Sequence, residues 1–108
     1  MRIVRVSEFE LRRIFNEGRY HERLQSGEFH STIVNEVRRK HGDHRVRNTR
    51  SQVVDYRDKH WQRVARVHQY RRKDGLLGAS GRPDPKMVFH DGVLYALETV
   101  EQWDIPKW

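Results

Sequence analysis

Among the side chains of this 108-residue chain that can act as acids, bases or cations, five candidates lie at or near the strands expected in its second half: His68, Tyr70, Arg82, Lys86 and His90. Cleavage of RNA without a metal ion needs a general base for the 2′-hydroxyl, a general acid for the leaving oxygen and a cation for the charge on the phosphate. A metal-independent ribonuclease is therefore one hypothesis. The structural alternative is that His68 is a half-buried strand residue and that His90 flanks a surface turn.

Positive charge is concentrated in one third of the chain. Residues 38–73 hold thirteen Lys and Arg against three Asp, a formal charge of +10, whereas the remainder carries −3. Arginine outnumbers lysine 17 to 5, and its planar fork of donors suits bidentate contact with phosphate. The leading hypothesis is a small basic protein that binds the nucleic-acid backbone through an arginine-rich face. The expected contacts are Arg38, Arg39, Lys40, Arg45, Arg47, Arg50, Arg57, Arg63 and Arg66.

Two alternatives to nucleic acid stay open for this basic segment. It could bind an acidic protein as an adaptor or inhibitor, or it could simply be a solvated charged surface. Trp61 lies among the basic residues, but it shares an apolar stripe with Val54 and Val64, which predicts a core position. Neither DNA nor RNA, nor single or double strands, is favoured by the pattern.

The sequence predicts no metal site and no cofactor. His41 and His44 lie three residues apart with Asp43 between them, but a zinc site needs further ligands and the chain has no cysteine. The glycine-rich stretch from Gly75 to Lys86 does not match a phosphate-binding loop, so it is expected to be an extended connector. These absences favour a binding protein over an enzyme.

Helical signals dominate the first half of the chain. Ser7 and Glu10 have the spacing of a capping box, which predicts a helix from about Glu8 after a short opening strand at 1–6. A second helix is expected from Ser31 to Gly42, where Ile33, Val34 and Val37 would share a face. A third is expected to begin at 48–49 and to run through residue 61.

Strand signals dominate the second half. Residues 62–72 fit either a helix or a strand, and the β-branched and aromatic residues before Asp74-Gly75 favour the strand. The segment from Lys86 to Leu97 is typical of a hairpin, with Asp91-Gly92 as the preferred turn pair.

Together these elements predict an α+β fold, with two or three N-terminal helices packed on one face of a small antiparallel sheet and a C-terminal β-hairpin. Residues 1–98 would form a single compact domain. Residues 99–108 would form a tail in which Trp103 and Trp108 dock on the body or on another chain, so a homo-oligomer is one expected assembly. The order of elements resembles the architecture of small RelE-type messenger-cleaving toxins, which implies a ribonuclease; no catalytic residue is carried over from this likeness.

Composition limits the class of protein. The longest apolar run, Val93 to Leu97, is far shorter than a membrane span or a signal-peptide core, so a cytoplasmic protein without membrane partners is expected. The absence of cysteine excludes disulfides and thiol catalysis.

Overall fold

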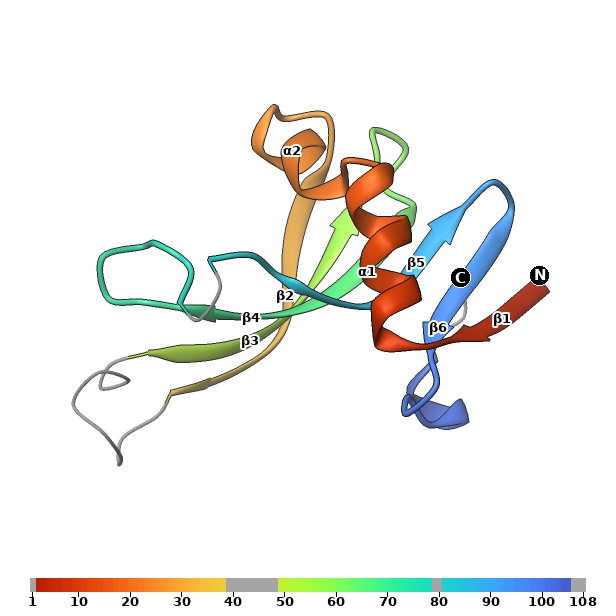
Figure 1. Cartoon of the computed structure of the whole chain (residues 1–108). Helices are drawn as coiled ribbons and strands as arrows, with labels where there is room; N and C mark the ends of the chain where they lie inside the picture. The colour runs from red at the N-terminus through yellow and green to blue at the C-terminus, as the bar shows by residue number, and fades with distance from the viewer. Residues whose placement is uncertain (1, 39–48, 79–80, 106–108) are drawn as a thin grey trace.

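The computed structural model describes residues 2–38, 49–78 and 81–105 and contains one six-stranded mixed sheet (Figure 1). The strand order is β1-β6-β5-β4-β3-β2, and all neighbours are antiparallel except β1, which pairs parallel to β6. The strands are β1 (Arg2–Val6), β2 (His30–Arg38), β3 (Arg50–Arg57), β4 (Arg63–Arg71), β5 (Asp84–His90) and β6 (Val93–Leu97). The helices are α1 (Glu8–Glu17), α2 (Tyr20–Gln25) and a short 3-10 helix, Gln102–Asp104.

Helix α1 begins where the sequence predicts it. The Ser7 hydroxyl accepts a hydrogen bond from the backbone N–H of Glu10 at 3.2 Å, which satisfies one of the free donors of the first turn. The buried side of α1 presents Leu11 and Phe15 to the sheet, and the helix packs mainly on β5 and β6 (Figure 1). The chain then turns at Gly18, where a Cβ atom would collide with the ring of Tyr20.

The main core lies between the two helices and one face of the sheet. Three aromatic rings form its centre, with Phe15 stacked on Tyr20 at 5.7 Å between ring centroids and tilted against Tyr56 at 6.0 Å. Val54 and Val67 supply the floor from β3 and β4, and both are fully buried. This core holds the helices on one part of the sheet only.

The predicted fold class is wrong in its helices and in its sheet. The segment expected to be a helix from Ser31 to Gly42 is strand β2 as far as Arg38, and the segment expected to be a third helix is strand β3. The sheet is also mixed rather than antiparallel, because β1 pairs parallel to β6.

The physical reason for the first error is a β-bulge. The pairing register of β2 shifts between Ile33 and Asn35, so the apolar residues of this strand do not alternate regularly. Ile33, Val34 and Val37 therefore have helical spacing, although all three are β-branched and more than half of each of Ile33 and Val37 is exposed.

Several strand predictions are confirmed. Residues 2–6 form β1, and residues 63–71 form β4. The hairpin of β5 and β6 closes through Asp91 and Gly92, whose φ angles of 49° and 77° fit the two left-handed positions of a type I′ turn.

The C-terminal segment packs on the face of the sheet away from the helices. Val100 and Ile105 cover a small cluster of Met87, Leu94 and Ala96. Trp103, expected to dock, is 79% exposed, and Trp108 lies outside the described residues. The division into a domain of 1–98 and a tail remains a prediction. Over the described ranges, no helix is long and apolar enough to cross a membrane.

Candidate nucleic-acid interface

Strands β2, β3 and β4 carry three successive rungs of side chains on the face that packs against the helices. The first rung is apolar, with Ile33, Val54 and Val67 in register. Because side chains alternate along a strand, residues two positions further on in β3 and β4 face the same side, and in β2 the bulge between Ile33 and Asn35 adds one residue to this step. The second rung is Glu36, Gln52 and Gln69, and the third is Arg38, Arg50 and Arg71. The face therefore changes from apolar to polar to cationic toward one end of the sheet.

The second rung is a hydrogen-bonded network. The side-chain amide of Gln69 donates to Gln52 at 2.9 Å, and the amide of Gln52 donates to the carboxylate of Glu36 at 2.6 Å. Gln52 and Gln69 are buried, so these bonds satisfy polar groups that have little access to water. The network fixes the register of the three strands next to the third rung.

The third rung, which we call the arginine row, consists of Arg38, Arg50 and Arg71. Arg38 pairs with Arg50 across β2 and β3, and Arg50 pairs with Arg71 across β3 and β4, so three like charges lie directly opposite one another. Like charges in this arrangement destabilise a sheet. All three residues are exposed, and they lie at the strand ends that project beyond the helices (Figure 1).

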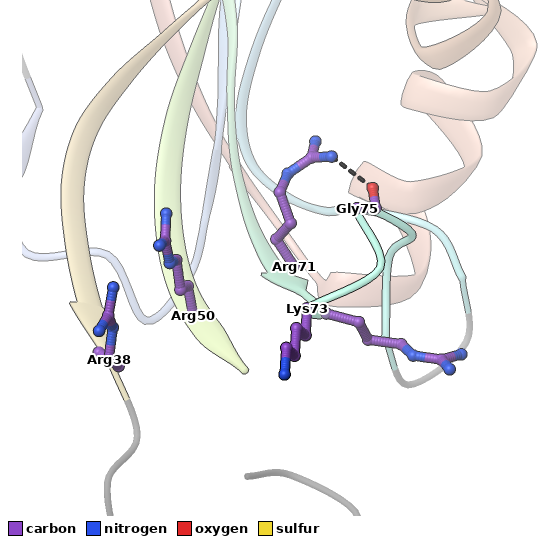
Figure 2. A pocket seen from close by; sticks show the side chains of 6 residues that line it. Arg38, Arg50, Arg71, Lys73 and Gly75 are labelled. Atoms are coloured by element: carbon purple, nitrogen blue, oxygen red, sulfur yellow. Dashed lines mark hydrogen bonds between the residues drawn. The ribbon is translucent and has the colours of Figure 1, made fainter. Parts of the chain in front are cut away.

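A shallow pocket of about 370 Å³ opens at the arginine row. The turn after β4 completes its wall with Arg72, Lys73 and Gly75 (Figure 2). The guanidinium of Arg71 donates to the carbonyl of Gly75 at 2.6 Å, and this bond holds the turn against the end of the strand. Gly75 has a φ of 86°, a left-handed conformation that glycine adopts without strain.

The pocket carries an excess of positive charge. Its five cationic residues meet only two carboxylates among the described residues, because Glu36 lies 3.5 Å from Arg50 and Asp74 lies 3.0 Å from Arg72. Within the same described ranges, Arg38 and Lys73 have no ion-pair partner. An anion with several oxygens would find unused donors here.

The structure divides the arginines that the sequence analysis groups together. Arg38 and Arg50 belong to the arginine row, whereas Arg63 and Arg66 bind the buried carboxylate of Asp55. Arg66 forms a bidentate pair with it, at 2.6 and 3.0 Å, and Arg63 approaches to 3.3 Å. We call these three residues the Asp55 cluster. Because Asp55 follows Val54 along β3, the cluster lies on the opposite face of the sheet.

Arg57 has a third role. Its guanidinium donates to the carbonyl of Trp61 at 2.9 Å and lies 5.4 Å from the centre of the indole ring. Trp61 itself is 55% exposed and has a φ of 63°, so the expected core position is wrong. The residue lies in the turn between β3 and β4, where no core surrounds it.

The predicted interface and the residues that line the pocket differ in two ways. Arg39, Lys40, Arg45 and Arg47 lie outside the described residues. Arg71, Arg72 and Lys73 line the pocket but were not among the predicted contacts. The sequence signal for these three residues is the predicted turn at Lys73-Asp74-Gly75. This turn follows the end of β4, which lies beside the start of β3.

The five candidate ribonuclease residues do not form one site. His68 bonds to Ser51 at 2.7 Å and contacts Tyr70 edge-on, on the face opposite the arginine row. Arg82 pairs with Glu22 of α2 at 3.0 Å. His90 lies at the end of β5 against Tyr20, and Lys86 lies four residues earlier in that strand.

No protein-family model, curated protein or solved structure matches this chain. Among the residues that the structure describes, no group of three or more potential ligands is placed to hold a metal ion, and His41 and His44 fall outside those residues.

Proposed function

We propose that this chain is a small cytoplasmic protein that binds the phosphate backbone of a nucleic acid through the arginine row and Lys73. The observation that carries the proposal is the register of Arg38, Arg50 and Arg71 across three strands of one face. Opposed like charges cost folding free energy, and a bound polyanion would remove that cost.

The dimensions of the row suit a polyanion. Neighbouring Cα atoms across an antiparallel pair lie about 5 Å apart, so three arginines extend over roughly 10 Å. More than one backbone phosphate occupies such a length of a nucleic-acid strand. Guanidinium groups present parallel donors to phosphate oxygens, whereas a single small anion would leave part of the row unused.

The lining of the pocket predicts low sequence selectivity. Among the residues that the structure describes, this lining consists of five cationic side chains and one glycine and includes no aromatic ring on which a base could stack. Contacts to phosphate position a nucleic acid without reading its bases. We therefore expect similar affinity for oligonucleotides of different sequence.

Fluorescence anisotropy with labelled RNA and duplex DNA tests this function. Replacing all three arginines of the row by glutamine should weaken binding roughly 100-fold at about 0.15 M salt, because each lost phosphate contact also loses its counterion release. The matched control replaces Arg2, Arg12 and Arg13 by glutamine, which removes the same charge from β1 and α1, and it should bind within a few-fold of wild type. Equal losses in both variants would contradict the site and leave only a general effect of net charge.

An acidic protein partner is the competing explanation for the same surface. It would be favoured if neither RNA nor DNA bound at low salt while the row variant remained folded. In that case the nucleic-acid proposal fails.

A further inference from the structure

The turn between β3 and β4 presents an exposed tryptophan in a strained backbone conformation. This turn follows the end of β3 that lies away from the arginine row (Figure 1). Trp61 has a φ of 63°, and 55% of the residue is exposed. A left-handed conformation is costly for a bulky aromatic residue, and residues of this kind are concentrated at binding sites. Trp61 belongs to neither core cluster of the described residues, so a role in the core does not explain it.

Hydrogen bonds on both sides of Trp61 fix the turn. The carboxylate of Asp58 accepts from the backbone N–H groups of His60 and Gln62, both at 2.9 Å. The backbone N–H of Trp61 donates to the carbonyl of Asp58, also at 2.9 Å. Such bonds hold a turn in one conformation. The indole ring therefore has a defined position before any ligand binds, which lowers the entropy that binding must remove.

A pocket of about 530 Å³ borders the same turn. Lys59 and His60 line it together with Tyr20 of α2 and His90 of the β5–β6 hairpin. Trp61 is not part of this lining in the described chain. Its ring contacts a different set of side chains, which belong to strands β2 and β3.

Two basic side chains lie beside the indole ring on the face of the sheet away from the helices. Arg57 follows Asp55 by two positions in β3, so both point to this face. The guanidinium of Arg57 lies 5.4 Å from the indole centre, and the imidazole of His30, directly opposite on β2, lies 6.2 Å away. We call Trp61, Arg57 and His30 the Trp61 site. More than half of Trp61 stays exposed beside both neighbours, which leaves part of its ring open to a ligand.

Arg57 gives the Trp61 site a positive charge that no carboxylate neutralises. Its guanidinium donates to the carbonyl of Trp61 at 2.9 Å, and within the described ranges it has no ion-pair partner. The carboxylate two positions earlier, Asp55, is bound by Arg63 and Arg66 instead. A ligand that suits this site has a flat ring for the indole and a negative charge for the guanidinium.

We propose that the Trp61 site binds an unpaired base of a single-stranded nucleic acid, with Arg57 at the adjacent phosphate. The proposal rests on the proposed backbone binding and adds that the ligand is single-stranded. A base can stack on a side chain only when it is free of the stack in a duplex. Because every base has a flat face, this contact is tolerant of sequence and agrees with the low selectivity expected of the arginine row.

Fluorescence anisotropy with a labelled oligouridylate and with duplex RNA of the same length tests the site. Trp61→Gly suits the left-handed backbone, so the turn should stay intact, and binding of the oligouridylate should weaken roughly tenfold. Its affinity for the duplex should stay within about twofold of wild type, because the duplex is held by its phosphates. Trp61→Phe keeps an aromatic ring and should retain most of the affinity. Trp103→Ala, which removes an exposed tryptophan outside the site, should change neither affinity.

Tryptophan fluorescence measures the stacking itself. Replacing Trp103 and Trp108 by phenylalanine leaves Trp61 as the only tryptophan of the chain. Oligouridylate should quench the emission of Trp61 in this variant, and duplex RNA should not, because its bases are already stacked on one another.

The proposal is overturned if Trp61→Gly binds oligouridylate as tightly as wild type, or if the replacement weakens duplex binding by the same factor. It is also overturned if oligouridylate leaves the emission of Trp61 unchanged. Backbone binding by the arginine row would stand in each of these cases if the triple glutamine variant of the row loses affinity for the duplex. If wild type binds neither ligand, both proposals fail.

Discussion

Two groups of arginines on the opposite faces of one sheet have different surroundings. Arg63 and Arg66 share one carboxylate, Asp55, which is only 1% exposed, and their charge is used inside the protein. Arg38 and Arg71 lie in an exposed row in which the nearest charged neighbours across the strands are other arginines. The Asp55 cluster therefore serves the fold, and the arginine row is available to a ligand.

This difference shows why a count of charges along a sequence is an incomplete guide to a binding face. Both groups belong to the segment of +10 formal charge, and nothing in the spacing of their residues separates them. The separation comes from which face of a strand each residue occupies and from whether a carboxylate lies opposite. Asp55 pairs with Arg66 across β3 and β4, whereas Arg50 pairs with arginines on both sides.

The largest effect is expected from removing the shared carboxylate. Asp55→Ala should lower the free energy of unfolding by about 3 kcal/mol, because it leaves the largely buried guanidinium of Arg66 without its bidentate partner. Urea denaturation followed by circular dichroism measures the loss. A change below about 1 kcal/mol would show that the Asp55 cluster is not structural.

A pair of single replacements should separate the two groups. Arg66→Gln should cost about 2 kcal/mol of stability and leave RNA affinity nearly unchanged. Arg50→Gln should change stability by less than about 0.5 kcal/mol and weaken RNA binding roughly fivefold at about 0.15 M salt. Denaturation and anisotropy on both proteins give the four values. If both replacements lower stability, or both weaken RNA binding, the distinction between the two groups of arginines is wrong.

Salt should reveal the repulsion within the arginine row. Raising sodium chloride from about 0.02 to 0.5 M shortens the screening length, so wild type without ligand should gain up to about 1 kcal/mol of stability. The triple glutamine variant of the row should gain less, and the triple variant of Arg2, Arg12 and Arg13 should gain at least as much as wild type. Identical changes of stability with salt in all three proteins would show that repulsion within the arginine row does not measurably destabilise the fold.

The smallest expected effect is a pH dependence of stability near Arg82, which is ion-paired like the Asp55 cluster but exposed like the arginine row. Arg82 pairs with Glu22 but is half exposed. Burial, followed by the charge of Arg82, lowers the pKa of His21, while Glu22 opposes the shift. Because the unfolded chain then binds the proton more tightly, stability should fall as pH decreases from about 6.5. In denaturation experiments between about pH 7.5 and 5, the free energy of unfolding of His21→Gln should fall less than that of wild type. An identical fall in the two proteins would show that His21 is not the titrating group.

Local signals in the sequence predicted the parts of the fold that local chemistry decides. Ser7 begins α1 through its side-chain cap, and Asp91-Gly92 closes the last hairpin through its left-handed positions. Strand β2 could not be recognised in this way, because the bulge between Ile33 and Asn35 interrupts the alternation on which strand prediction depends.

The candidate sites depend on contacts between distant parts of the sequence. Arg38, Arg50 and Arg71 are far apart along the chain and meet only through strand register. His60 and His90 share a pocket because two turns from different hairpins approach α2. The sequence predicted His90 and the basic segment as candidates. No periodicity could show that His60 lines the same pocket as His90, or that Arg71 lies opposite Arg50.

The most direct test of the arginine row as a backbone-binding surface is the salt dependence of RNA affinity for wild type and for the triple glutamine variant. A plot of the logarithm of affinity against the logarithm of salt concentration should be less steep in the variant by about 2 to 3, close to 0.7 to 0.9 for each lost phosphate contact. Equal slopes in the two proteins would contradict contact between these arginines and the phosphate backbone.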